Sequence, residues 1–405
     1  MKIHLRALAG TSTGYYLTLG GLLLLVALGA YAAWTLEHLG HVASGMNNQI
    51  VWGLPHMFAV FLIVAASGAL NVASMASAFG KTAYKPLAPL SALLAMALLS
   101  GGLAVLLLDL GRPERLLVAL THFNFKSIFA WNVVLYSGFM ALVAAYLWTM
   151  LEWSAKAWSA RVGLAAFLWR VTLTTGTGSI FGFLIGRQAL GSALLGPMFV
   201  VYSLSYGLAV FVLVLLAISH WTAKPLDAAM LARLLRLQAL FVALVLFVVL
   251  VYHLTHLYFA RQHGVERFLL LDGGIYTMLF WLVHLLLGNV LPLVLLLRGR
   301  PTATRAVLAT LLVCLGGMAQ MYVTIVGSQA FALVIFPGYA VRSSFGDGVV
   351  ASYTPAALEW LLGLGGMALA ALITLLALKW LTLLPQRLDR FPADEAYAPV
   401  AGAQP

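Results

Sequence analysis

The chain has 405 residues, of which 63% are hydrophobic and only 9% are charged. A soluble domain carries roughly 25% charged residues, so this composition excludes a protein whose main solvent is water. The net charge of +11 does not indicate nucleic-acid binding, because that function needs a basic face on a soluble domain. The sequence therefore predicts an all-α integral membrane protein.

Hydrophobic runs alternate with short polar segments along the chain. Each membrane helix needs roughly 20 apolar residues, so these runs predict about ten transmembrane helices. Their expected ranges are 13–35, 53–79, 87–109, 128–151, 162–185, 194–219, 237–260, 274–297, 305–336 and 355–383. The fifth is the least apolar, because Arg170 and a hydroxyl-rich run at 172–179 interrupt it. The first has a basic flank like that of a signal peptide, but no clear cleavage site follows, and we expect it to be retained.

The basic residues of the loops are shared unequally between the two sides of the predicted bundle. With ten spans, 15 lysines and arginines fall on the side of both termini and 7 on the opposite side. The positive-inside rule then predicts that both termini are cytoplasmic. We expect a multi-pass protein of the bacterial inner membrane.

A faint internal repeat opens the second and sixth spans. The two segments are Gly53-Leu-Pro-His-Met-Phe-Ala-Val-Phe61 and Leu195-Gly-Pro-Met-Phe-Val-Val-Tyr202. Each leads a block of four spans, which predicts two four-helix bundles flanked by single helices. The expected divisions are the first helix with its outer loop at 1–52, the two bundles at 53–190 and 191–337, and the last helix with a cytoplasmic tail at 338–405. Gly68 and Gly101-Gly102 are expected where helices approach closely.

Ionisable and amide side chains inside a membrane are costly and more often functional than not. In the first block they gather near the outer ends of the spans, at Trp52, His56, Asp109, Asn132 and Tyr136. A quinone headgroup needs hydrogen-bond donors and proton exchange, which histidine and a carboxylate supply. We expect His56 and Asp109 to be catalytic. Quinone binding is expected at Trp52, His56, Asp109, Arg112, Asn132 and Tyr136. Pairing of Asp109 with Arg112, one turn further on, is the structural alternative.

A b-type haem is a second interpretation of the outer-half residues. It needs two histidines at equal depth on facing helices, and His253 or His256 with His284 is the available pair. The spacing does not favour it, because dihaem bundles present histidines about four turns apart on one helix. The single cysteine cannot form a disulfide or an iron–sulfur cluster alone. We therefore expect no metal or haem in this chain. His256 and His263 are expected at the outer interface.

The inner half of the bundle contains few polar residues. Asn71, Arg170 and Thr174, with neighbouring hydroxyls, are a possible proton path from the cytoplasm. The alternative is that the hydroxyls bond backbone carbonyls and that Arg170 extends to the inner interface. A secondary transporter is a rival from another class, since internal repeats and a glycine-interrupted span are typical of transporters. Transporter sites lie near the midplane, however, whereas the ionisable residues here crowd one face.

Four stretches carry a resemblance to a known family. They are Gly45-Met-Asn-Asn-Gln-Ile-Val-Trp-Gly-Leu-Pro-His56, Ala65-Ala-Ser-Gly-Ala-Leu-Asn71, Asp109-Leu-Gly-Arg-Pro-Glu-Arg115 and Thr174-Thr-Gly-Thr-Gly-Ser-Ile-Phe-Gly182. They resemble the NrfD/PsrC family of membrane quinone-interacting subunits. Within that family the likeness is greatest to DsrP, the ten-span membrane subunit of the DsrMKJOP sulfur-metabolism complex. The resemblance covers the first five spans well and the remainder by layout.

The resemblance implies electron exchange between a quinol at the outer face and a periplasmic iron–sulfur partner. The quinone would be menaquinone or ubiquinone, and the partner a ferredoxin-like subunit accompanied by a multihaem cytochrome c and a further membrane subunit. His56 is the nearest match to a histidine that contacts the quinone in the family. We expect His56 to exchange a proton with the quinol and Asp109 to relay it outward. Arg112 and Arg115 would fix the carboxylate or dock an acidic partner.

Overall fold

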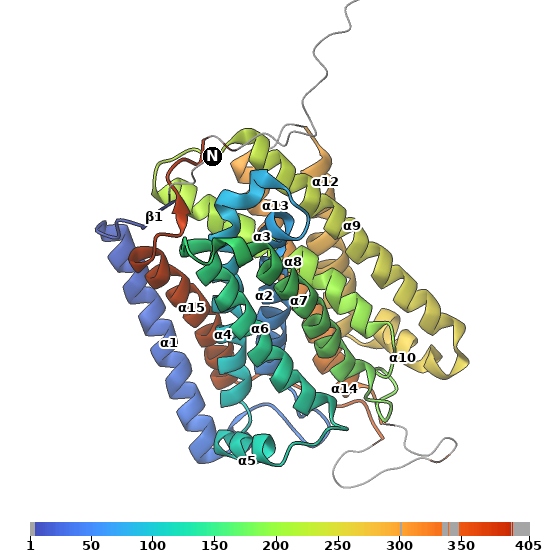
Figure 1. Cartoon of the computed structure of the whole chain (residues 1–405). Helices are drawn as coiled ribbons and strands as arrows, with labels where there is room; N and C mark the ends of the chain where they lie inside the picture. The colour runs from blue at the N-terminus through green and yellow to red at the C-terminus, as the bar shows by residue number, and fades with distance from the viewer. Residues whose placement is uncertain (1–4, 300–301, 334–338, 340–347, 390, 392–405) are drawn as a thin grey trace, which may run out of the picture.

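The computed structural model describes residues 5–299, 302–333, 339, 348–389 and 391. Within these residues the chain consists of helices joined by loops and turns, with a small sheet in which β1 (Leu5–Arg6) pairs antiparallel with β2 (Leu384–Pro385). The long helices run roughly side by side and form one bundle (Figure 1). The all-α prediction is confirmed.

Nine helical segments of the described residues are long and apolar enough to cross a membrane. They are α1 (Thr13–Leu39), α2 with α3 (Leu54–Ala69 and Asn71–Ser77), η2 with α4 (Thr82–Leu87 and Ala88–Leu108), α6 (Ile128–Leu151), α8 (Leu195–Trp221), α9 (Ala228–Tyr258), α11 with η7 and α12 (Ile275–Met278, Leu279–Val290 and Leu291–Leu297), α13 with η8 and α14 (Ala303–Tyr322, Val323–Gly327 and Ser328–Ala330), and α15 (Ala357–Trp380). The segments η7 and η8 are π-helical.

The predicted fifth span is the helix α7 (Ser159–Gly182), which packs between α6 and α8. Its 24 residues reach about 36 Å at the rise of an α-helix, enough to cross a hydrocarbon core of about 30 Å. It is less apolar than the other nine segments because of Arg170 and its threonines. The prediction of about ten spans thus corresponds to nine apolar segments together with α7.

Short helical turns connect the long helices. They are η1 (His41–Ala43), η3 (Pro113–Arg115), α5 (Leu116–Thr121), η4 (Lys156–Trp158), η5 (Ala260–Gln262), α10 (His263–Arg267) and η6 (Phe268–Asp272). Figure 1 shows α5, α10 and α14 at one end of the bundle and the β1 strand at the other. Because β1 pairs with β2, the segments next to α1 and α15 meet at the same end, as an even number of crossings requires.

One helix boundary differs clearly from its prediction. The helix α9 begins at Ala228, whereas the sequence predicts a span from residue 237. The side chain of Asp227 accepts a hydrogen bond from the amide of Ala229 and caps the helix there. The apolar run begins only after Arg233 and Arg236, so hydropathy alone misses the first turns.

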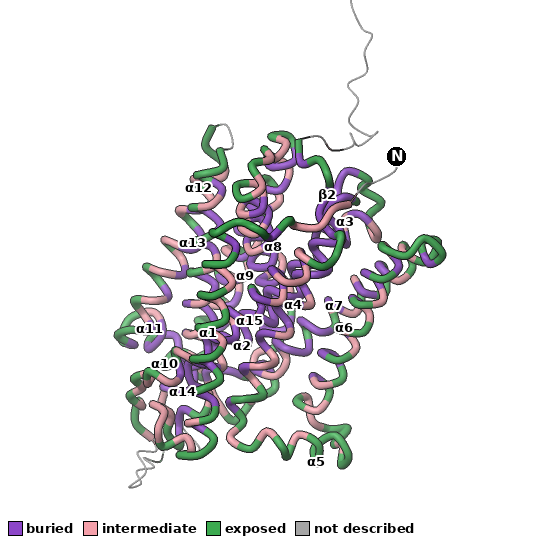
Figure 2. The backbone as a smooth tube through the Cα atoms, turned by 90° about the vertical axis from the view of Figure 1, so that its left-hand side faces the viewer, coloured by how far each residue is buried: buried purple, intermediate pink, exposed green. Residues whose placement is uncertain are grey.

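The helix α2 occupies the centre of the bundle, where it packs against α4, α8 and α15. Figure 2 shows how deeply the central helices are buried compared with the rim. Every residue of α2 except His56 is buried. A Cβ added at Gly68 would lie 1.6 Å from the carbonyl oxygen of Ser203 on α8, and one at Gly102 would lie 2.9 Å from the carbonyl oxygen of Ala59. The expected close helix contacts at these glycines are confirmed.

The helix α1 packs mainly against α15, at the edge of the bundle. The two backbones nearly touch, since a Cβ added at Gly29 would lie 2.8 Å from the Cα atom of Gly365. The predicted division of the remaining helices into two four-helix bundles stays a prediction. The part of the fold that matters for the site is the end of the bundle near α5, where α2, α4, α6 and α7 enclose a common space.

Candidate functional site

A cavity of about 610 Å³ lies between α2, α4, α5, α6 and α7. This volume is typical of small-molecule sites, which combine apolar walls with a few placed polar groups. Most of the lining is apolar, from the leucines of α4 and α5 to the aromatic rings of α6 and α7. The polar side chains that line it between the helices include His56, Asn132, Tyr136 and Thr177. The first three are residues that the sequence predicts for quinone binding.

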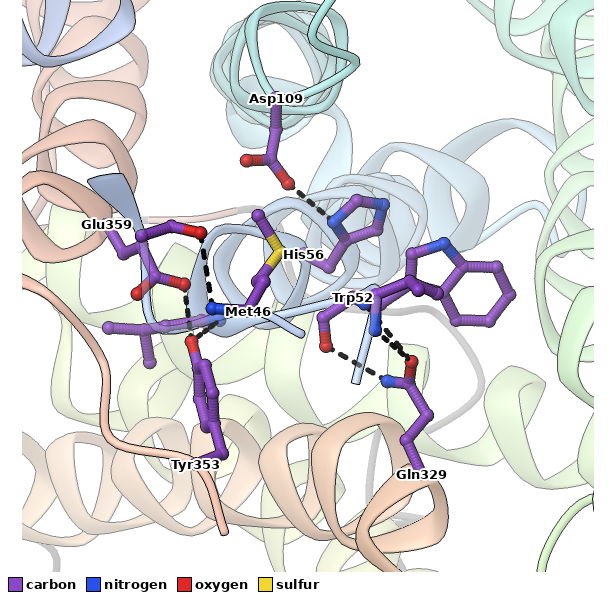
Figure 3. A network of polar contacts seen from close by, with 10 residues as sticks. Met46, Trp52, His56, Asp109, Gln329, Tyr353 and Glu359 are labelled. Carbon is purple, nitrogen blue, oxygen red and sulfur yellow. Dashed lines mark hydrogen bonds and ion pairs between the residues drawn. The ribbon is translucent and has the colours of Figure 1, made fainter. Parts of the chain in front are cut away.

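His56 lies in the first turn of α2 and faces Asp109, the residue that ends α4 (Figure 3). Its Nδ1 atom is 2.7 Å from Oδ2 of Asp109. The Asp109 side chain is fully buried, and the His56 side chain is 14% exposed, on the cavity side. The contact is an ion-pair distance and not an aligned hydrogen bond, because Nδ1 of His56 and both oxygens of Asp109 lack a hydrogen-bond partner among the described residues. A buried carboxylate with one imidazole partner is an arrangement that can hold and release a proton.

Trp52 covers His56 on the side of the cavity. Its indole ring stacks on the imidazole, with ring centroids 5.8 Å apart and planes inclined by 23°. Phe129 and Phe181 contact the same indole at 6.0 and 5.8 Å, the latter edge to face. The aromatic wall that results is suited to a flat ring, because aromatic faces and edges prefer such offset or perpendicular contacts.

Asn132 and Tyr136 lie one turn apart on α6 and face α7. The amide of Asn132 donates to the carbonyl oxygens of Ile128 and Gly176, at 2.8 and 3.2 Å. The hydroxyl of Tyr136 has a longer contact, 3.4 Å, with the hydroxyl of Thr177. The Tyr136 hydroxyl therefore retains hydrogen-bonding capacity toward a ligand. Thr177 is a site residue that the sequence predicted only as part of a hydroxyl-rich run.

Arg112 and Arg115 are exposed and lie in the chain between Leu110 and Leu116, which line the cavity. Within the described residues neither forms an ion pair with Asp109, whose carboxylate contacts His56 instead. The chain leaves α4 through Gly111, which has a φ of +70°, so Arg112 does not continue the helix. The geometry therefore leaves these arginines free to meet a partner.

The inner polar residues form a compact buried cluster. The guanidinium of Arg170 donates to the carbonyl oxygen of Ser67 at 2.9 Å and to the side-chain oxygen of Asn71 at 2.7 Å. The hydroxyl of Thr174 bonds that of Ser67 at 2.7 Å. Arg170 is only 5% exposed, so the expectation that it extends to the interface is wrong. The other half of that alternative is confirmed, because the hydroxyls of α7 donate to backbone carbonyls four residues earlier, at Thr172, Thr174, Thr177 and Ser179. The break between α2 and α3 lies beside this cluster.

A second acid–base cluster was not recognised from the sequence. Glu266 of α10 receives contacts from Nδ1 of His253 at 2.6 Å and from Nδ1 of His256 at 3.1 Å. Burial acts to raise the pKa of Glu266, but the hydrogen bonds and charges of the two histidines outweigh it and lower that pKa below its usual range. His256 lies in the last turn of α9 and is 3% exposed, whereas His263 is exposed.

The geometry does not favour a haem between these histidines. His284 is fully buried, and its Nδ1 atom lies 3.1 Å from the carbonyl oxygen of Gly316. At this level η7 and α13 nearly touch, because a Cβ added at Gly288 would lie 2.4 Å from the Cα atom of Gly316. His253 and His256 both direct Nδ1 to Glu266. In the described part of the chain, no group of three or more His, Cys, Asp or Glu residues has an arrangement that could hold a metal ion.

The N-terminus of α2 is held by residues that lie far along the sequence (Figure 3). The hydroxyl of Tyr353 accepts a hydrogen bond from the amide of Leu54 at 2.7 Å and donates to Glu359 at 2.5 Å. Glu359 also accepts from the amide of Gly45 at 2.9 Å. A Cβ at Gly53 would lie 2.5 Å from the Glu359 carboxylate, so the tight fit requires glycine there. Tyr353 was not predicted.

The fold and the site together define a multi-pass helical membrane protein with an apolar small-molecule cavity near one end of the bundle. A buried histidine–carboxylate pair opens onto that cavity. The chain belongs to the family described as polysulphide reductase, NrfD, which matches residues 42–333.

Three relatives are similar to the chain along most of their length. The Hdr-like menaquinol oxidoreductase integral membrane subunit of Archaeoglobus fulgidus is 28% identical over 96% of this chain and 98% of its own. The putative dimethyl sulfoxide reductase membrane subunit of Halobacterium salinarum is 28% identical over 97% and 95%. A selenate reductase subunit of Mesobacillus selenatarsenatis is 24% identical over 82% and 86%.

Proposed function

We propose that the chain is the quinol-interacting membrane subunit of a multisubunit oxidoreductase. The observation that carries the proposal is the His56–Asp109 pair at the edge of an apolar cavity. The relatives support it, because one is named as a menaquinol oxidoreductase subunit and the other two as subunits of reductases. A quinol carries two hydroxyl groups on a flat apolar ring, which suits both the aromatic wall and the polar groups of the cavity.

The proposed reaction divides between this chain and a partner. Oxidation of a quinol releases two electrons and two protons, and the reverse reaction takes them up. His56 accepts the two protons in turn: it takes the first from a quinol oxygen, the Asp109 carboxylate stabilises the imidazolium and passes that proton outward, and the regenerated imidazole then takes the second. Tyr136 donates a hydrogen bond to the ring's other oxygen. The electrons pass to or from a redox centre in the partner.

The identity of the complex is the finer part of the proposal. We infer a periplasmic ferredoxin-like iron–sulfur subunit, with a multihaem cytochrome c and a further membrane subunit, in the sulfur-metabolism complex that the DsrP likeness implies. The exposed Arg112 and Arg115 supply positive charge for an acidic partner at the cavity end of the bundle. This end would face the periplasm of a bacterial inner membrane, with both termini cytoplasmic. The quinone would be menaquinone or ubiquinone.

The test replaces His56 by alanine in the assembled complex. Quinol oxidation should fall by at least about a hundredfold, the usual contribution of a positioned acid–base group. The matched control is His220→Ala, which removes an exposed histidine at the end of α8. Normal quinol turnover in His56→Ala, in complexes that purify intact, would contradict the proposal. Loss of assembly in that variant alone would reduce His56 to a structural role.

The buried Arg170 cluster favours a second function, proton movement coupled to quinol turnover. Arg170, Thr174 and Thr177 occupy one face of α7 at four- and three-residue intervals, which places them in a row between the cluster and the cavity. In liposomes, Arg170→Gln should abolish internal pH changes driven by quinol turnover. Unchanged acidification in that variant would remove this second function and leave the first intact.

A further inference from the structure

The indole of Trp52 covers His56, but Trp52 belongs to a loop and not to a helix. The residues 44–53 before α2 are irregular and must be fixed by contacts from elsewhere. One side chain supplies most of these contacts at the tryptophan. The Oε1 atom of Gln329 accepts hydrogen bonds from the amides of Val51 at 3.0 Å and Trp52 at 3.1 Å. Its Nε2 atom donates to the carbonyl oxygen of Trp52 at 3.0 Å.

Gln329 is itself held in place from several directions. It is 2% exposed and lies on α14, directly after the π-helical segment η8. Its Nε2 atom also donates to the carbonyl oxygen of Ile325 at 2.7 Å, which fixes the side-chain rotamer. Arg187 bridges the two segments, donating to the backbone oxygens of Gln329 at 3.3 Å and of Gln49 at 2.7 Å. The amide group of Gln329 is therefore a rigid template for the loop.

We propose that Gln329 is a positioning residue of the quinol site, acting through Trp52. It is not among the described residues that line the cavity, so it does not touch the ligand directly. It fixes both backbone polar groups of Trp52, and this sets the indole at 5.8 Å from the imidazole of His56 and against Phe181. The inference rests on the proposed quinol function and extends it, because it assigns control of the cavity wall to a residue 277 positions away.

The chemistry of the contact requires a glutamine. One end of the side chain must accept two amide hydrogens, and the other end must donate to a carbonyl oxygen. Leucine has a similar size but satisfies none of these groups, and an ionised glutamate satisfies the two amides but sets an oxygen against the carbonyl oxygens of Trp52 and Ile325. Gln329→Leu should therefore release the loop, and Gln329→Glu should have an intermediate effect.

The experiment measures quinol oxidation by the purified complex with menadiol as the substrate. Gln329→Leu should raise KM by about ten- to a hundredfold, because displacements of about 1 Å in a site have effects of this size. Gln329→Glu should raise KM less. The matched control is Gln238→Leu, which removes a fully buried glutamine that donates to the backbone and hydroxyl oxygens of Ser205 on α8. It should leave the KM for menadiol unchanged.

The outcomes separate this inference from the proposed function. If Gln329→Leu and Gln238→Leu raise KM equally, the effect is general destabilisation and the positioning role is wrong. If Gln329→Leu leaves both KM and kcat unchanged while His56→Ala loses activity, the positioning role fails and the quinol site stands. If His56→Ala is fully active, the proposed function itself fails. Should Gln329→Leu not assemble, Gln329→Glu decides, since an unchanged KM there overturns the inference.

Discussion

Asp109 and His56 meet from helix ends that would each disfavour their charge. Asp109 ends α4, where the helix dipole is negative, and His56 lies in the first turn of α2, where it is positive. A carboxylate at a C-terminus and an imidazolium at an N-terminus are each unfavourable alone. At 2.7 Å between Nδ1 of His56 and Oδ2 of Asp109, each side chain offsets the unfavourable helix end of the other.

This arrangement predicts the effect of Asp109→Asn. The amide keeps the shape of the side chain but leaves a proton on His56 without a counter-charge in a buried site. We expect quinol turnover to fall by at least about tenfold while the complex still assembles. Asp272→Asn, at an exposed residue paired with Arg267, serves as the control in the same turnover assay. Wild-type turnover in Asp109→Asn would limit the carboxylate to a packing role.

The hydroxyl of Tyr136, whose one contact is the long one with Thr177, leads to a second prediction. Tyr136→Phe removes only the oxygen that faces the cavity and its weak contact with Thr177. We expect the KM for quinol to rise about tenfold, equivalent to one hydrogen bond of about 1.4 kcal/mol, with little loss of thermal stability. The control is Tyr146→Phe, on the same helix, whose hydroxyl donates to the carbonyl oxygen of Ala73. That variant should lose stability and keep its KM. The reverse pattern would exclude Tyr136 as a ligand.

The Glu266 cluster predicts a pH-dependent contribution to stability. Because the folded-state pKa of Glu266 is lowered, its ionised form is stabilising above the usual carboxyl range, and this contribution is lost as the pH falls through the folded pKa. Glu266→Gln should therefore be less stable than the wild type near neutral pH, by about 2 kcal/mol. The difference in Tm should narrow below about pH 4.5. Glu114→Gln, an exposed acid, should show no such difference, and a constant gap across the range would refute the assignment.

The crossing of α2 and α8 makes a prediction about packing. A Cβ at Gly68 would meet the backbone of Ser203, and one at Gly207 would lie 2.1 Å from the carbonyl carbon of Gly68. Neither backbone can yield easily, so Gly68→Ala should destabilise the protein by about 3 kcal/mol or more and reduce the yield of folded protein. Gly21→Ala, at an open position of α1, should be neutral or slightly stabilising in the same thermal assay. Equal yields would show that α2 and α8 can separate.

Much of the fold could be predicted because one physical signal dominates it. Apolar length sets the helices, and the depth of each polar residue along its span follows from counting turns. This counting placed His56, Asn132 and Tyr136 at one level, and they do line one cavity. It also found the close contacts at Gly68, because small residues in apolar helices indicate touching backbones.

Which side chains contact one another could not be predicted in the same way. The sequence suggests Arg112 as a partner of Asp109 because it follows one turn later, but Gly111 ends the helical path. The true partner, His56, lies on another helix. Tyr353 was not predicted for a similar reason, because its role depends on a hydrogen bond with the amide of Leu54, 299 positions earlier in the chain. Depth is a local property, whereas rotation of a helix about its axis is set by its neighbours.

The contact between Tyr353 and Leu54 also bears on biosynthesis. The amide that begins α2 remains uncapped until a residue 299 positions later has been made and its loop has folded back. During insertion, the early helices can therefore cross the membrane before the loop that carries Trp52 acquires its final shape. A nascent or truncated chain that ends before Tyr353 lacks the hydrogen bond that holds the amide of Leu54, two residues after Trp52.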